Sequence, residues 1–159
     1  MNVAIVLLIL LTVLFALTFF TKRRFGVLGL ALTAGATLSG LWTPDVVPIV
    51  QQAGVELVAP PLSSVVAAAI ILLPAVVLLF SGPTYSSKLQ RAIGALVFSL
   101  LALAFMLEPL GGALVLEGDG KRLFDILVEY RVWIITAGIL LALADLLFVK
   151  TPKISKEKH

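Results

Sequence analysis

The sequence has no cysteine, only one histidine and little charge. The absence of cysteine excludes disulfides, thiolate nucleophiles and Cys-ligated metals. The one histidine, His159, is the last residue, a position typical of a solvated tail. The sequence also offers no phosphate-binding glycine loop, no Ser–His pair and no His/Asp/Glu cluster. We therefore expect no catalytic residue, no cofactor and no metal site, and a protein that is not an enzyme.

Charged residues make up 13% of the chain and hydrophobic residues 60%, with a mean hydropathy of +1.14. A soluble domain is about a quarter charged, because a polar shell must cover its core. The net charge of +3 is spread over several loops, which argues against nucleic-acid binding. The apolar surplus indicates that the chain is embedded in a lipid bilayer.

Five apolar runs are long enough, or nearly so, to cross a bilayer as helices, which takes roughly 17–25 residues. None shows the alternating pattern of a membrane β-strand. We predict an all-α polytopic transmembrane bundle with five spans, at about 3–20, 25–42, 62–80, 92–110 and 132–149. Residues 1–149 would form one transmembrane domain and residues 150–159 a basic tail. Basic residues follow the first run instead of preceding it, which favours a retained span over a cleaved signal peptide.

The basic residues predict the orientation of the spans, because cytoplasmic loops are enriched in Lys and Arg. The first and third loops and the tail hold nine of the twelve, and the second and fourth loops hold three. We therefore expect the N-terminus outside and the C-terminus in the cytoplasm, with a bacterial inner membrane as the location. Both tryptophans then lie at the outer interface. The tail is either a solvated anchor or a contact for anionic lipid through Lys150, Lys153, Lys156 and Lys158.

The two predicted outer loops contain amphipathic segments. Thr43-Pro44-Asp45 is typical of a helix start, and apolar residues recur at helical spacing from there to Leu57. Residues 121–131 likewise show one apolar and one charged face. We expect two short interfacial helices on the outer side, which either cap the bundle or dock an external partner.

Small residues run along the predicted second span. Such residues let helix backbones approach closely, which is how helices associate in lipid. They serve either packing within one chain or a contact between identical chains. The packing candidates are Gly26, Gly29, Thr33, Gly35 and Gly40.

Two single residues stand out inside the spans. Pro74 removes a backbone hydrogen bond from the third span and should bend it. Asp145 is the one ionisable residue clearly inside a span, where a charge is costly. Asp145 either belongs to an ion or proton path or forms a structural pair with a basic residue near the cytoplasmic end: Lys88, Arg91 or Lys150.

Two segments suggest a family. Lys22-Arg23-Arg24-Phe25-Gly26 joins the first two spans, and Leu89-Gln90-Arg91-Ala92-Ile93-Gly94 leads into the fourth. Over roughly the first 110 residues the chain resembles the colicin V production protein family of bacterial inner-membrane proteins. It departs from that family in Gln90, which replaces an acid, in Phe98, which replaces a small residue, and in having a fifth span. The resemblance implies an envelope-maintenance or secretion-accessory role without catalytic residues.

These observations favour a non-enzymatic membrane protein that acts by assembly. We expect an accessory or scaffold subunit of an envelope or transport complex, with copies of itself or other membrane proteins as partners. The alternative is a small transporter or channel component that forms a path by oligomerisation.

Overall fold

The computed structural model describes residues 3–114 and 118–148. Within them the chain forms five α-helices and no strand: α1 (Val3–Thr21), α2 (Phe25–Gln52), α3 (Leu62–Leu79), α4 (Lys88–Ala113) and α5 (Gly118–Leu147). Each helix is long and apolar enough to cross a membrane. The predicted all-α class is confirmed for the described residues, and its five helices are candidate membrane spans by length and composition. The basic tail predicted for residues 150–159 lies outside the described residues.

The first three helices begin at the residues predicted for the first three spans. The turn between α1 and α2 has only three residues, and Lys22 in this turn has a left-handed backbone with φ of 60°. α2 ends just before Gly54, whose φ of 87° favours a residue without a side chain. These short connections place consecutive helices antiparallel and next to each other.

The prediction of a separate interfacial helix after the second span is wrong. α2 continues as one helix to Gln52, with Pro44 and Pro48 inside it. A proline removes one helical hydrogen bond, whereas a break would leave several more backbone groups without a helical partner. The helix therefore tolerates both prolines, and the segment expected to start a new helix extends the span.

The second predicted interfacial helix is also part of a longer element. α5 runs without interruption from Gly118 to Leu147 and includes residues 121–131. No proline or glycine lies between Gly120 and Gly138, so nothing in the sequence ends a helix there. The amphipathic pattern instead marks the end of a span that leaves the membrane.

Helix lengths explain where the charged residues go. α2 and α5 have 28 and 30 residues and are therefore about 42 and 45 Å long. The hydrocarbon core of a bilayer is about 30 Å thick, close to the length of α1 and α3. The two long helices must tilt or project beyond the core, and the projecting ends carry the acids and bases of the predicted outer loops.

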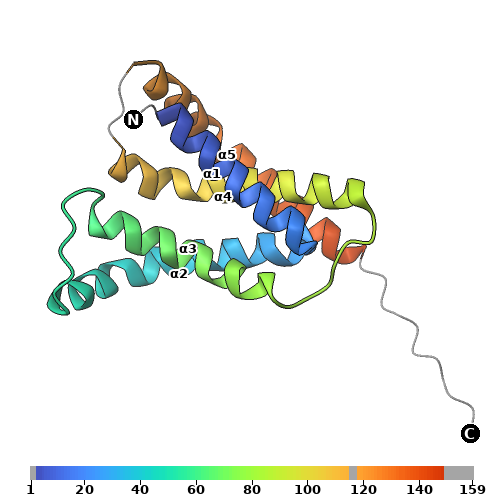
Figure 1. Ribbon diagram of the computed structural model, residues 1–159, viewed down its shortest axis with the longest axis horizontal. Coiled ribbons are helices and arrows are strands. Elements are labelled where there is room, and N and C mark those ends of the chain that lie inside the picture. Colours follow the sequence, from blue (N-terminus) through green and yellow to red (C-terminus); the bar gives the residue numbers. More distant parts are fainter. Residues whose placement is uncertain (1–2, 115–117, 149–159) are drawn as a thin grey trace, which may run out of the picture.

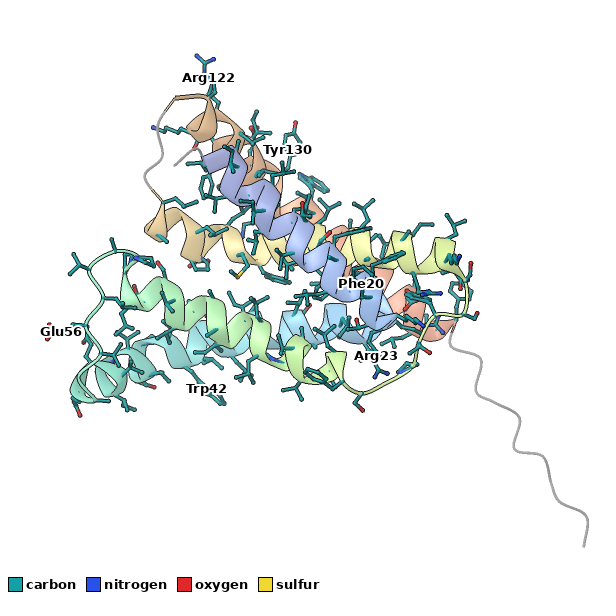
Figure 2. All side chains as sticks on the ribbon, viewed as in Figure 1. Phe20, Arg23, Trp42, Glu56, Arg122 and Tyr130 are labelled. Atoms are coloured by element: carbon teal, nitrogen blue, oxygen red, sulfur yellow. The ribbon has the colours of Figure 1, made fainter. Side chains whose placement is uncertain are left out.

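The five helices form two groups that meet at one end (Figure 1). α2 and α3 pack together as a hairpin, while α1 and α5 pack against α4. At one end, called the junction end here, lie the α1–α2 turn, the α3–α4 loop and the last turn of α5. At the other, the open end, the α2–α3 loop diverges from the start of α5. Figure 2 shows this separation, with Arg23 at the junction end and Glu56 and Arg122 on different arms of the open end.

The centre of the bundle is α4, which contacts the other four helices. Leu28 and Leu32 of α2, Leu101 and Phe98 of α4 and Ala142 of α5 are buried together there. Large apolar side chains that remain exposed cover the outward faces of α1 and α5, as lipid contact requires. The buried side chains of α4 therefore form the surface on which the other four helices pack.

Candidate functional site

The junction end contains an ion pair between Arg24 and Asp145. Their side chains are 2.9 Å apart and each is 17% exposed, and Arg24 also donates to the main-chain oxygen of Asp145 at 3.2 Å. The structural pair expected for Asp145 is present, but the partners Lys88 and Arg91 were wrong, and Lys150 lies outside the described residues. The turn after α1 brings Arg24 to the last turn of α5, which sequence spacing alone does not reveal.

Asp145 also caps the start of α2. Its Oδ2 accepts a hydrogen bond from the backbone N–H of Gly26 at 2.9 Å. The first N–H groups of a helix have no partner within the helix, and a negative charge there is favoured by the helix dipole. The N–H of Phe25 donates to the Tyr85 hydroxyl at 3.2 Å. Side chains from α5 and the α3–α4 loop thus supply the cap that α2 does not supply itself.

Glycines allow α2 to reach α5 closely enough for these contacts. A Cβ at Gly26 would lie 2.7 Å from the carbonyl oxygen of Ala142 and 3.0 Å from Asp145 Oδ2. A Cβ at Gly29 would lie 3.0 Å from the Ala142 side chain. These two packing candidates therefore contact a helix of the same chain, and a homo-oligomer contact through them would require α2 and α5 to separate.

The α1–α2 turn and the α3–α4 loop are hydrogen-bonded to each other. The N–H of Arg24 donates to the carbonyl of Pro83 at 3.1 Å, and that of Tyr85 to the carbonyl of Lys22 at 2.9 Å. Arg23 Nε donates to the carbonyl of Leu79 at 2.9 Å, in the last turn of α3. A basic side chain is favourable at a helix C-terminus, where carbonyls lack partners. The two connections therefore form one unit.

Tyr85 lies between the charges of this unit and the core. The Arg24 guanidinium is 5.3 Å from the Tyr85 ring centre, a distance typical of a cation–π contact. The hydrogen bond that Arg24 donates to Asp145 raises the pKa of Arg24, and burial raises the pKa of Tyr85. Gly94 of α4 makes room for the ring, since a Cβ there would be 2.7 Å from it. At neutral pH the Arg24 guanidinium stays charged and the Tyr85 phenol stays neutral.

The middle of the bundle contains a close crossing of α2 and α3. A Cβ at Gly35 would lie 2.2 Å from the carbonyl oxygen of Ile71 and 3.0 Å from that of Ile70. Pro74, inside α3, has no N–H for the Ile70 carbonyl. The glycine therefore places backbone of α2 against carbonyls of α3, one of which lacks its helical partner. Thr33 lies nearby on α2 and donates to the carbonyl of Gly29 at 3.0 Å.

The open end contains a cleft of about 560 Å³ between the two helix groups. It extends along α2 from Ala36 to Pro48 and reaches Phe105 of α4. Arg131 of α5 and Glu108 of α4 also line it and form an ion pair of 3.0 Å. Gly40, the last packing candidate, lines the cleft too, and a Cβ there would meet nothing within 4 Å. Sequence reasoning missed both the cleft and its ion pair, because neither has a motif.

The described residues contain no group of three or more potential metal-ligating side chains. Comparisons with protein-family models, with curated proteins and with solved structures give no match. The arrangement therefore has to be interpreted from its own chemistry. The junction end has charged groups that engage each other, and the open end has a space lined by polar and apolar groups.

Proposed function

We propose that this chain is a non-enzymatic membrane protein that acts as an accessory or scaffold subunit of an envelope or transport complex. The observation that carries the proposal is the state of Asp145, which is engaged by Arg24 and by the N–H of Gly26. A carboxylate that moves protons or ions must exchange partners, whereas this one joins three parts of the fold. Its charge thus contributes to a rigid frame on which other subunits can assemble.

The proposed location is a bacterial inner membrane, with the junction end in the cytoplasm. The basic residues of the first and third loops lie at that end. Cytoplasmic loops are enriched in Lys and Arg, which supports this orientation. The resemblance to the colicin V production protein family supports the same class of role. Both of its segments lie at the junction end, where Gly26 packs beside Asp145 and Gly94 beside Tyr85.

Native mass spectrometry of the protein, extracted gently from its source membrane, tests the assembly role. We expect the 16.9 kDa chain to carry the added mass of other protein subunits. Masses at multiples of 16.9 kDa alone would favour the oligomeric transporter instead. A chain without any protein partner, in several mild detergents, would contradict both.

Cysteine labelling tests the orientation, because the chain has no native cysteine. Glu56→Cys introduces a thiol in the exposed α2–α3 loop, and Ser86→Cys introduces one in the exposed α3–α4 loop. A membrane-impermeant maleimide should label the first variant in intact cells and the second only after permeabilisation. The opposite pattern would reverse the proposed orientation.

The second candidate function is a transporter or channel component built by oligomerisation. The observation that favours it is the cleft, which enters the fold from the open end. The Arg24–Asp145 pair lies at the opposite end of the fold, where a path would have to leave. This candidate requires that Asp145→Asn abolish a flux in proteoliposomes, and an unchanged flux would remove Asp145 from such a path.

A further inference from the structure

The cleft at the open end has the dimensions of a site for a long, slender molecule. Ala36 and Pro48 are twelve residues apart on α2, so the cleft is about 18 Å long. Its volume of about 560 Å³ lies within the range of about 300–1,000 Å³ found for small-molecule sites. A cleft of this length and volume can hold a hydrocarbon chain.

The lining changes in character along the cleft. The inner part is apolar, with Ala36 of α2, Ile71 of α3 and the buried Phe105 of α4. Towards the open end the lining has hydroxyl groups and the ion pair at the rim. The hydroxyl residues are Ser39, Thr43, Ser63 and Ser64. This gradient matches an amphiphile whose chain points to the middle of the membrane and whose head group lies at its surface.

The rim groups define the head group further. Arg131 can bind a phosphate and Glu108 an ammonium, so the rim has no net charge and complements a zwitterion. Pro44 and Pro48 have no N–H, which leaves the carbonyls of Gly40 and Pro44 without helical partners. Both residues line the cleft, and their carbonyls can accept hydrogen bonds. A primary ammonium supplies three donors, whereas a trimethylated one supplies none.

We propose that this cleft binds one zwitterionic aminophospholipid, with an acyl chain between α2, α3 and α4 and the head group at Glu108 and Arg131. The leaflet is the outer one if the proposed orientation holds. The binding itself does not depend on the accessory role. The bound lipid fills the space between the two helix groups, so it holds the α2–α3 hairpin against the rest of the bundle.

Native mass spectrometry with defined lipids tests the proposal. The delipidated protein is mixed with phosphatidylethanolamine, phosphatidylcholine or phosphatidylglycerol, all with the same acyl chains. We expect one lipid to be retained, with phosphatidylethanolamine bound about tenfold more tightly than the other two, a difference of about 1.4 kcal/mol. Equal retention of the three lipids would overturn the proposed head-group recognition.

Three variants locate the binding. Gly40→Phe places a ring in the cleft without a clash at Cβ, and it should reduce retention of phosphatidylethanolamine at least about tenfold. Its control is Ala137→Phe, which adds the same ring to an exposed position of α5 and should change nothing. Glu108→Gln should remove the preference for phosphatidylethanolamine, because Glu108 is the group that meets the ammonium. Arg131→Gln should weaken retention of all three lipids, whereas Arg122→Gln, in an exposed pair elsewhere on α5, should change neither.

Thermal unfolding of each variant in detergent checks that the fold is intact. Undiminished retention in a folded Gly40→Phe variant would show that the lipid binds elsewhere and would overturn the proposal. Lipid adducts and protein subunits have different masses, so one set of spectra separates this result from the result for the accessory role. Loss of protein partners with an unchanged lipid adduct would contradict only the accessory role.

Discussion

The two ends of the bundle each hold an arginine–carboxylate pair, in very different surroundings. At the junction end Arg24 and Asp145 are 2.9 Å apart and each is 17% exposed. At the open end Arg131 and Glu108 are 3.0 Å apart, with Arg131 31% and Glu108 76% exposed. The junction pair also makes two hydrogen bonds with backbone groups, the carbonyl of Asp145 and the N–H of Gly26, whereas the open pair lies at the rim of a cleft. Surroundings rather than distance therefore decide what each pair contributes.

The same contrast applies to glycines of α2. Gly26, Gly29 and Gly35 lie where another helix leaves no room for a side chain, and Gly40 lies where a side chain meets nothing. One helix thus has a tightly packed half and an open half. The same substitution should therefore destabilise the protein in the packed half and have little effect in the open half.

The largest effect is expected for Gly35→Leu. Its Cβ would lie 2.2 Å from a backbone oxygen of α3, and backbone cannot give way as a side chain does. We expect a loss of about 3 kcal/mol or more, or no folded protein. Thermal unfolding in detergent, followed by circular dichroism, measures it.

Gly40→Leu is the matched control for that substitution, on the same helix and with the same added side chain. It should be close to neutral, because nothing lies within 4 Å of its Cβ. Gly35→Ala is the milder test, and it should destabilise although alanine normally favours a helix over glycine. Equal stability of the two leucine variants would show that α2 and α3 do not cross at Gly35.

The next effect is expected for the junction pair. Asp145→Ala leaves the Arg24 charge largely buried without its partner and removes the cap of α2, so we expect a loss of about 3 kcal/mol. Reversing the pair, with Arg24→Asp and Asp145→Arg together, restores opposite charges but supplies no acceptor from α5 for Gly26. The reversed protein should therefore recover only part of the loss. Full recovery would show that the cap contributes nothing.

A smaller effect is expected for the open pair. Glu108→Gln removes a charge that is 76% exposed, so it should cost less than about 1 kcal/mol and become undetectable at high salt. Unfolding curves at low and high salt measure this. A cost as large as that of Asp145→Ala would break the contrast between the two ends.

The smallest effect concerns the phenol at the junction. Burial raises the pKa of Tyr85 above its ordinary value of 10.0, so the folded state favours the neutral phenol. This contribution to stability is complete below pH 10.0 and is lost as pH rises through the raised pKa. In a Tyr130→Phe variant, tyrosinate absorbance of the folded protein should titrate above 10.0. A midpoint at or below 10.0 would mean that water reaches the phenol.

The spans were predictable because long apolar runs have one favourable arrangement in lipid. A helix satisfies every backbone group within the segment, so composition alone predicts five helices and most of their starts. The continuation of α2 through Pro44 was not predictable in the same way. Proline is typical both of a first helical turn and of a kink, and only the surroundings of the segment decide between them.

The site was much less predictable, because its contacts join distant segments. Asp145 could be identified as costly, but the sequence pointed to Lys88, Arg91 or Lys150 as its partner, whereas the actual partner, Arg24, lies 121 residues away in the first loop. Gly26 was recognised as a packing residue, whereas its N–H could not be assigned to Asp145. The cleft depends on how two helix groups diverge, and no local pattern encodes that angle.

The capping of α2 by Asp145 also has a consequence for how the protein is made. Gly26 and Asp145 are separated by 119 residues, so α2 is synthesised long before the side chain that caps it. Until α5 arrives, Arg24 and the N–H of Gly26 lack the partners that Asp145 supplies. Insertion of α5 then completes the cap of α2, so a helix made late fixes the start of a helix made early.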